Sequence, residues 1–541
     1  MAAEYDAIVV GGGHNGLVAA AYLARAGART VVLEARASVG GAATTERPWG
    51  SDFKVSALSY VVSLMPPRIV RDLNLERHGY RIHPQESYFV PLPDGGALAV
   101  GGKSPAEVRA EVARFSRRDA DALERWDEWI GALGAVLGPL LLRPPPALGS
   151  TTPADVADQM ALAWRLRGLG RRGVADLTRL MTMSISDLLD DWFESAEVKA
   201  MLAVSGVIGT WAGPAEPGTA YVMLHHHVGD LGDGAVGRWG FPEGGMGAVS
   251  GALRAAAERL GARVRTDAPV ARVLTRGGRA TGVALRDGEE LAAPLVVTAV
   301  HPKIAFLEHL DRSELPDDFV RDVERWNTRS GVVKVNLAVA ELPRFRAAPD
   351  PSPGVHGGTI VLAPSVGYVE DAFQAARAGR AADAPFADVC IPSFYDRTLA
   401  PDGAHVVSMF TQWVPHEWAA EPHDDELDAY ADRAVAALAE HAPNVAGAIL
   451  HRQVIGPHRM QTEYGLVGGN IFHGELSADQ LFHMRPAPGY ADYRTPIAGL
   501  YQCGSATHGG GGVTGIPGLN ATRAIARDRR RGRLRGLVRR A

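Results

Sequence analysis

The feature that most constrains the fold is a glycine motif near the start of the chain. Three glycines spell G-x-G-x-x-G: Gly11, Gly13 and Gly16. A β-branched run at 5–10 precedes the motif, an Ala/Leu-rich segment at 17–26 follows it, and a second apolar run at 28–33 ends at Glu34. A glycine motif between strand and helix, followed by another strand, is typical of a dinucleotide-binding βαβ unit. The sequence therefore predicts a Rossmann-like α/β domain here.

Each residue type in this unit has a physical role toward a pyrophosphate and a ribose. Gly11 permits the tight turn, and Gly13 lets backbone N–H groups approach the pyrophosphate at the helix N-terminus. Gly16 allows the helix to pack closely on the strand. The carboxylate of Glu34 can accept hydrogen bonds from ribose hydroxyls, and it would repel a 2′-phosphate. The unit alone leaves FAD and NAD as alternatives.

The residues after Glu34 favour FAD. They read E-x-R-x-x-x-G-G, with Arg36 as a cationic partner and a second glycine pair near the pyrophosphate. This extension resembles the FAD-binding signature of the flavin amine oxidase and phytoene desaturase superfamily, although Ala42 stands where amine oxidases usually have Arg. The resemblance implies non-covalent FAD held by Gly11, Gly13, His14, Asn15, Gly16, Glu34, Ala35, Arg36, Gly40, Gly41, Ala42 and Thr44.

A second glycine-rich turn lies at the other end of the chain. An apolar run at 500–504 leads through a glycine-rich loop into a helical pattern at 519–530. The helix N-terminus would direct amides and a positive dipole at electron-rich flavin atoms. Relatives close the FAD site with such a segment, although many have Asp where Ser505 stands. The expected contacts are Gly504, Ser505, Thr514, Gly515 and Ile516, with Val270 contacting the adenine through its backbone.

The whole chain resembles the phytoene desaturase-related FAD oxidoreductases, and within them the branch named after a pyridine nucleotide-disulfide oxidoreductase domain. The matching stretches are 9–45, 49–64, 209–230, 331–342, 405–417 and 500–524. Cys390 and Cys503 are too far apart in sequence to form a redox-active C-x-x-C pair.

The resemblance implies an α/β fold in which two domains are interleaved. One is a Rossmann-like FAD-binding domain of the glutathione reductase/amine oxidase type, and the other is an α+β substrate domain of mixed sheet and helices. We expect the FAD domain at 1–75, 231–305 and 490–541, and the substrate domain at 76–230 and 306–489.

The implied activity is FAD-dependent dehydrogenation, or desaturation, of C–C single bonds in a small apolar substrate, with hydride transfer to flavin N5. Oxygen, a quinone or another acceptor would reoxidise the flavin. A flavin amine oxidase or a saturase on the same fold is an alternative. A non-catalytic FAD-containing regulatory or binding protein is another. No residue is marked as catalytic; the weak candidates are His508, His226 and Tyr221.

The consecutive histidines at 225–227 do not predict a metal site, because sequence neighbours do not face one another on a helix or strand. Two cysteines in 541 residues also exclude a disulfide scaffold.

Residues 521–541 carry nine Arg and one Asp, whereas the chain as a whole has a net charge of −5. The acidic body argues against nucleic-acid binding. The basic tail would suit peripheral contact with an anionic membrane, or simply be a solvated helix end. Oligomeric state stays open.

No targeting or membrane-spanning pattern is present in the sequence. Glu4 and Asp6 stand where a signal peptide would carry basic residues, and the longest apolar stretch, 130–142, is broken by glycine and proline. We therefore expect a cytoplasmic protein, at most peripheral to a membrane.

Among local elements, a capping box at Ser104 predicts a helix that runs past Trp129.

Overall fold

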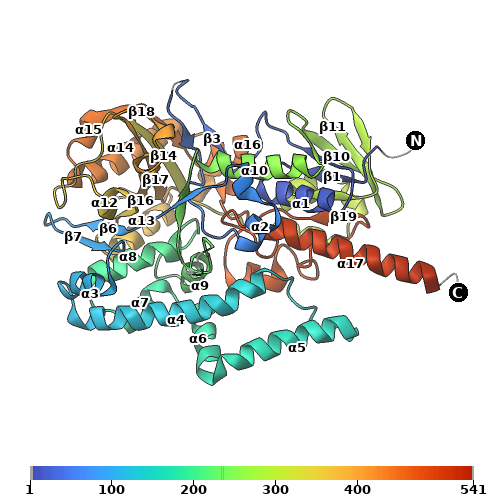
Figure 1. Ribbon diagram of the computed structural model, residues 1–541, viewed down its shortest axis with the longest axis horizontal. Coiled ribbons are helices and arrows are strands. Elements are labelled where there is room, and N and C mark those ends of the chain that lie inside the picture. The colour runs from blue at the N-terminus through green and yellow to red at the C-terminus, as the bar shows by residue number, and fades with distance from the viewer. Residues whose placement is uncertain (1–3, 51, 233, 235–236, 539–541) are drawn as a thin grey trace.

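The computed structural model describes residues 4–50, 52–232, 234 and 237–538, and it contains two main sheets that lie side by side (Figure 1). The first sheet is wholly parallel, in the order β19-β13-β1-β2-β9. Its strands are β1 (Ala7–Val10), β2 (Thr30–Leu33), β9 (Arg263–Arg265), β13 (Val296–Thr298) and β19 (Leu500–Gln502). This confirms the predicted Rossmann-like fold, with strands drawn from both ends of the chain.

Each face of the parallel sheet is covered. Three helices pack on one face: α1 (His14–Arg25), α10 (Met246–Arg259) and α17 (Ile516–Val538). A three-stranded antiparallel sheet covers the other: β10 (Val270–Thr275), β11 (Ala280–Leu285) and β12 (Glu290–Ala292). Because both faces are buried, the strands read as continuous apolar runs rather than as alternating ones.

The second sheet has seven strands, in the order β18-β14-β17-β16-β15-β6-β7, and all neighbours are antiparallel except β15 and β6. Its strands are β6 (Tyr88–Pro91), β7 (Ala97–Val100), β14 (Val332–Val339), β15 (Thr359–Leu362), β16 (Phe386–Cys390), β17 (His405–Gln412) and β18 (Ile449–Ile455). The short strands β3 (Thr45–Glu46), β4 (Val55–Ser56), β5 (Ile82–Pro84) and β8 (Gly240–Pro242) pair outside the main sheets.

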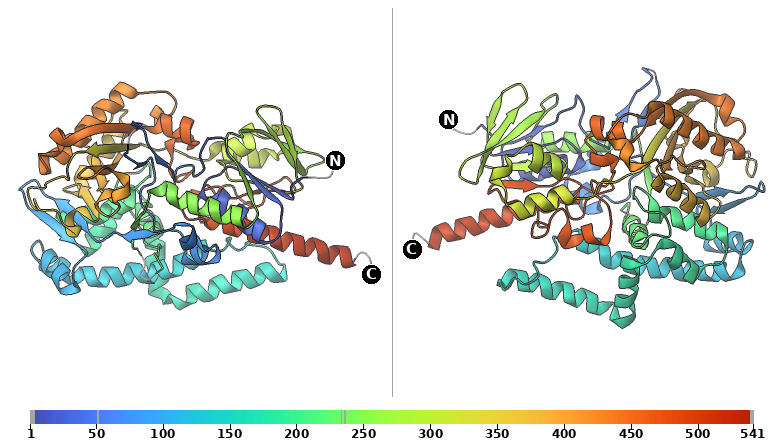
Figure 2. Two further views of the ribbon diagram at one scale, coloured as in Figure 1. Left: turned by 45° about the horizontal axis from the view of Figure 1, so that its top comes forward. Right: turned by 180° about the vertical axis from the view of Figure 1, so that it is seen from behind.

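A helical layer lies along one side of the molecule, beneath both sheets in the views of Figures 1 and 2. It comprises α3 (Pro105–Ala113), α4 (Arg117–Leu141), α5 (Pro153–Gly168), α6 (Gly170–Thr182), α7 (Ile185–Trp192), α8 (Ala196–Val207) and α9 (Thr219–His226). The remaining helices are α2 (Pro67–Asp72), α11 (Asp317–Arg325), α12 (Pro353–His356), α13 (Val366–Arg377), α14 (Asp424–His441), α15 (Val445–Ala448) and α16 (Pro457–Tyr464).

The prediction of one helix from Ser104 past Trp129 is wrong. The capping box at Ser104 forms, but α3 ends at Ala113 and α4 begins at Arg117. The side chain of Ser116 accepts a hydrogen bond from the Asp119 amide, so a second N-cap restarts the helix.

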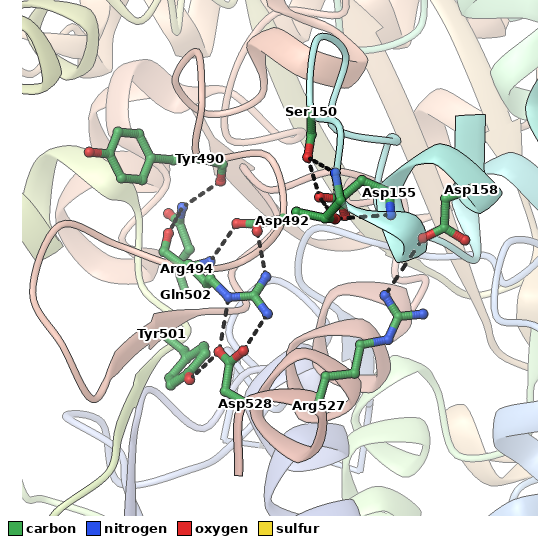
Figure 3. Close-up of polar contacts among 11 residues, drawn as sticks. Ser150, Asp155, Asp158, Tyr490, Asp492, Arg494, Tyr501, Gln502, Arg527 and Asp528 are labelled. Atoms are coloured by element: carbon green, nitrogen blue, oxygen red, sulfur yellow. Dashed lines mark hydrogen bonds and ion pairs between the residues drawn. The ribbon is translucent and has the colours of Figure 1, made fainter. Parts of the chain in front are cut away.

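The C-terminal helix α17 is held against the parallel sheet by a polar cluster (Figure 3). Arg494 donates to both carboxylate oxygens of Asp528, from Nε at 2.9 Å and Nη2 at 2.7 Å. The Tyr501 hydroxyl donates to the same carboxylate at 2.8 Å. These contacts hold the middle of α17 beside β19. Among the described residues, none of the helices combines the length and apolar character that a membrane span requires.

Candidate functional site

A cavity of about 830 Å³ lies between the two sheets. One half is lined by segments at the carboxyl ends of β1, β2 and β13, and the other by the facing side of β14, β16 and β17. Ligands of open α/β sheets bind at the carboxyl ends of the strands. The first half of the cavity is therefore where a dinucleotide would lie, and the second half is available to a substrate.

The glycine motif has the geometry that a pyrophosphate requires. Gly13 is the N-cap of α1, and no side chain caps it. The first amides of α1 are therefore left without intrahelical partners at the cavity wall. A Cβ on Gly13 would meet no atom of the described chain within 4 Å, because that space belongs to the cavity. A Cβ on Gly16 would stand 2.1 Å from the Gly11 carbonyl oxygen, so Gly16 serves packing of α1 on β1.

Glu34 directly follows β2, and its carboxylate is already oriented. Its Oε2 accepts a hydrogen bond from the Gly12 amide at 2.7 Å, and its Oε1 accepts one from the Arg36 amide at 2.9 Å. Arg36 in turn pairs with Glu46 at 3.1 Å, and its guanidinium lies 4.6 Å from the ring centre of Tyr464. The carboxylate keeps further lone pairs, and its contact with ribose hydroxyls stays a prediction.

The two ends of the chain meet in this site. Asn15 Nδ2 donates to Ser505 Oγ at 3.0 Å, and Asn15 Oδ1 is buried without a partner in the described chain. Thr514 Oγ1 donates to the Gly509 carbonyl at 2.8 Å and accepts from the Ile516 amide at 3.2 Å, which turns the loop into α17. The C-terminal loop thus closes over the N-terminal motif.

Three buried histidines line the same part of the cavity. His14 Nε2, His301 Nε2 and His473 Nδ1 have no hydrogen-bond partner among the described residues. Burial lowers the pKa of His14 to about 4 and of His473 to about 3, and it holds the pKa of His301 well below its usual range. The rings are therefore neutral, and each can donate one N–H. Unpartnered donors beside the α1 N-terminus fit an anionic pyrophosphate, so the residues present suit FAD.

The sequence analysis did not single out His301. His301 closely follows the end of β13, the parallel neighbour of β1. Position at the carboxyl end of a strand next to the glycine motif is the signal that would have identified it.

The structure brings most of the predicted cofactor residues together on the cavity wall. They are Gly11, Gly13, His14, Asn15, Gly16, Glu34, Ala35, Arg36, Gly40, Gly41, Ala42, Val270 and Ser505. The others do not line the cavity: Thr44, Gly504, Thr514, Gly515 and Ile516. Contact with FAD stays a prediction for the residues of both groups.

Of the three weak catalytic candidates, only His226 lines this cavity. Its Nδ1 lies 2.8 Å from the Val222 carbonyl oxygen, within α9. Tyr221 and His508 instead line a second, much smaller pocket together with the buried Arg485. Arg485 Nη2 donates a hydrogen bond to the Ser505 carbonyl at 3.2 Å. This contact helps to hold the C-terminal loop in place.

The substrate half of the cavity contains a buried cation that the sequence analysis did not single out. Lys334 on β14 pairs with Phe410 on β17, which pairs with Asp388 on β16, so the three side chains share one row on the cavity face. Lys334 Nζ donates to Ser408 Oγ, lies 3.1 Å from Asn336 Oδ1, and stands 4.6 Å from the ring centre of Tyr60. Burial lowers the pKa of Lys334 to about 7.

Asp388 completes the row with a buried carboxyl group. It accepts a weak hydrogen bond from Cys390 Sγ at 3.6 Å, and the Tyr60 hydroxyl also bonds to it. Burial raises the pKa of Asp388 to about 6, although Lys334 opposes the shift. A carboxyl and an amine that both titrate near neutral pH can hold or release a proton at this wall.

Side chains around the row are mainly apolar. Those that line the cavity include Leu58, Met201, Val204, Ile208, Val332, Val361, Met460, Ile471 and Phe472. Within the described residues, no group of three or more His, Cys, Asp or Glu side chains is arranged to hold a metal ion.

A parallel sheet with a glycine loop, an oriented carboxylate at the end of β2 and a closing C-terminal loop together define a flavoprotein of the Rossmann type. The family model for flavin-containing amine oxidoreductases matches residues 16–518. The chain belongs to this family, and its cofactor is FAD.

Relatives of known name agree with this assignment. The chain is 40% identical to pyridine nucleotide-disulfide oxidoreductase domain-containing protein 2 of Rattus norvegicus, over 97% of this chain and 94% of that protein. It is 24% identical to the phytoene desaturase (lycopene-forming) of a Paracoccus species, over 95% of this chain and 96% of that one. The predicted kinship to phytoene desaturase-related oxidoreductases is thus confirmed.

A solved structure supports the fold. A triple mutant of putrescine oxidase superposes with a TM-score of 0.61 at 18% identity, covering 97% of this chain and 99% of the other. At this identity the likeness concerns the fold alone.

Proposed function

We propose that this oxidoreductase dehydrogenates a C–C single bond of a small apolar molecule. The observation that carries the proposal is the wall of the substrate half, where Met201, Val204, Ile208, Ile471 and Phe472 gather on the cavity. Such a wall holds a ligand by burial of apolar surface, at about 25 cal/mol per Å². FAD, when bound, supplies the acceptor for the two electrons that leave the substrate. The name of the Paracoccus relative, a desaturase, supports the same reaction type.

The protein's own contribution is positioning and proton handling. Forming a C=C bond by hydride loss also requires a proton to leave the adjacent carbon. We assign that proton to a carboxylate oxygen of Asp388, the acid group that shares the cavity face with the apolar wall. Tyr60 and Cys390 orient this carboxylate by hydrogen bonding. With a pKa of about 6, Asp388 is ionised near neutral pH and can accept a proton there.

Amine oxidation is the second candidate, and Asp388 is the observation in its favour, because a carboxylate attracts a substrate ammonium. The position of Lys334 opposes it. Its Nζ stands 4.6 Å from the ring centre of Tyr60 and so takes one aromatic face that a substrate cation would use. In its protonated form, the lysine would repel a second cation at this wall.

Anaerobic reduction of the bound flavin tests the proposal. Purified holoprotein is mixed with matched panels of polyenes, acyl compounds and amines, and the flavin absorbance is followed. Bleaching by apolar hydrocarbons is expected. Bleaching by amines alone would establish the second candidate instead. A yellow protein that no compound bleaches would indicate a non-catalytic FAD-binding protein. Readmission of oxygen or of a quinone then identifies the acceptor that restores the absorbance.

A further inference from the structure

Helix α5 is an outlying element whose described residues are at most partly covered. Figures 1 and 2 show it on the outside of the molecule, along the side to which α4 and α17 also run. None of its described residues is buried. One end is tied to α17 through Asp158, whose carboxylate lies 4.0 Å from Arg527 (Figure 3), and the other continues into α6. A helix in a globular protein normally buries an apolar face, so the exposed face of α5 lacks a partner.

That face carries large apolar side chains. Val156, Met160 and Trp164 follow one another at intervals of four residues, which places them on one side of the helix. They are 40%, 65% and 71% exposed, and Leu148 in the preceding loop is 68% exposed. Of the eight large apolar side chains most exposed in the described chain, five lie between residues 148 and 174. The exposure is therefore a concentrated patch rather than scattered surface.

The patch is surrounded by positive charge. Residues 143–175 contain five Arg and two Asp, although the chain as a whole carries a net charge of −5. One of the two acids, Asp158, already pairs with Arg527 of α17. The guanidinium of Arg167 lies 5.2 Å from the ring centre of Trp164, so the cation and the exposed ring occupy the same face.

This combination suits an anionic lipid surface. Trp is favoured at the level of the lipid headgroups, and Arg can extend its charge toward phosphates while its stem covers apolar surface. A helix that exposes such side chains next to basic residues can lie in the interface plane. A second copy of this chain fits less well, since its net charge is small and its own patch would bring the same Arg residues face to face.

We propose that α5, with the loop before it and the start of α6, docks this protein on an anionic membrane surface. The stripe formed by Val156, Met160 and Trp164 enters the boundary between headgroups and acyl chains, and the neighbouring Arg side chains contact lipid phosphates. The docking surface is separate from the cavity and does not depend on the reaction proposed above. Docking through α5 is also distinct from membrane contact through the basic residues at the end of α17, because docking through α5 depends on the apolar stripe.

Vesicle flotation tests the proposal. The FAD-loaded protein is mixed with vesicles of phosphatidylcholine and phosphatidylglycerol in equal amounts, or of phosphatidylcholine alone. The test variant is Met160→Ser/Trp164→Ser, and the control is Leu450→Ser, a 50% exposed residue on β18. Wild type and control should float with the anionic vesicles, and the double variant should partition roughly tenfold less. Binding should weaken at high salt and on neutral vesicles.

Arg171→Glu/Arg172→Glu provides an independent arm that leaves the stripe intact, and it should also reduce flotation. Flavin absorbance and far-UV circular dichroism establish that each variant is folded. Equal flotation of wild type and Met160→Ser/Trp164→Ser would overturn the proposal, as would failure of the wild type to float. A wild-type dimer that the double variant dissociates would assign the patch to a second copy instead.

Discussion

Replacing Gly13 with valine should separate FAD binding from folding. The backbone at Gly13 has φ −66° and ψ 166°, an extended conformation that any residue adopts. A Cβ there meets no described atom within 4 Å, because it projects into the cavity. Removing a glycine stabilises by about 0.4–1 kcal/mol through the unfolded chain. Losing a favourable N-cap residue offsets part of this gain. The free energy of unfolding of the apoprotein should therefore change by less than about 1 kcal/mol.

The effect on FAD should be much larger. The valine side chain would fill the space through which a pyrophosphate reaches the amides at the start of α1. We expect the affinity for FAD to fall at least roughly 100-fold, which is about 2.7 kcal/mol. Gly16→Ala is the matched control, since its Cβ would stand 2.1 Å from the Gly11 carbonyl oxygen. That variant should destabilise the apoprotein itself by about 1–3 kcal/mol.

Urea unfolding with and without FAD measures both quantities. At an FAD concentration about 100 times Kd, the wild type should gain about 2.7 kcal/mol of stability, and Gly13→Val should gain almost none. Wild-type flavin content in Gly13→Val would refute the placement of the pyrophosphate. A large loss of apoprotein stability in the same variant would show that the glycine is needed for packing rather than for ligand space.

Three further changes test other parts of the site. Asp388→Asn should slow anaerobic flavin reduction roughly 100-fold. In the wild type this rate should fall as the pH drops through about 6, because a protonated carboxyl cannot accept the substrate proton, and the variant should lack that limb. Glu34→Gln keeps the side-chain shape but removes the charge, so FAD affinity measured by fluorescence quenching should fall roughly tenfold; unchanged affinity would exclude a ribose contact. Arg494→Met removes the two hydrogen bonds to Asp528, and thermal unfolding should show a loss of about 1–2 kcal/mol.

The cofactor half of the site could be predicted because its determinants are local. Gly11 is required by its positive φ, Gly16 by its close packing on the Gly11 carbonyl, and Gly13 by the space left beside the helix N-terminus. Glu34 follows one helix later, at the end of the adjacent strand. Spacing along the chain therefore reports directly on spacing in the βαβ unit. The closing loop at Ser505 was predicted for the same reason, as a second strand–turn–helix.

The substrate half could not be predicted in this way. Lys334 and Asp388 each stand alone within an apolar strand, and only the register of β14, β17 and β16 brings them into one row. That register depends on pairing between strands distant in sequence. The available signal was a single charge inside a run of buried residues, since such a group must be compensated by partners that the strand itself does not supply.

The meeting of Asn15 and Ser505 also has a consequence for the order of events in synthesis. These residues are 490 positions apart, and β19, which flanks β13, is the last strand among the described residues. At a synthesis rate of about 5–20 residues per second, the ribosome makes the N-terminal glycine motif roughly 25–100 s before the loop that contains Ser505. The nascent chain therefore holds only half of a flavin site, with the edge of β13 unpaired. Cofactor loading is accordingly a late step, which completes the fold rather than starting it.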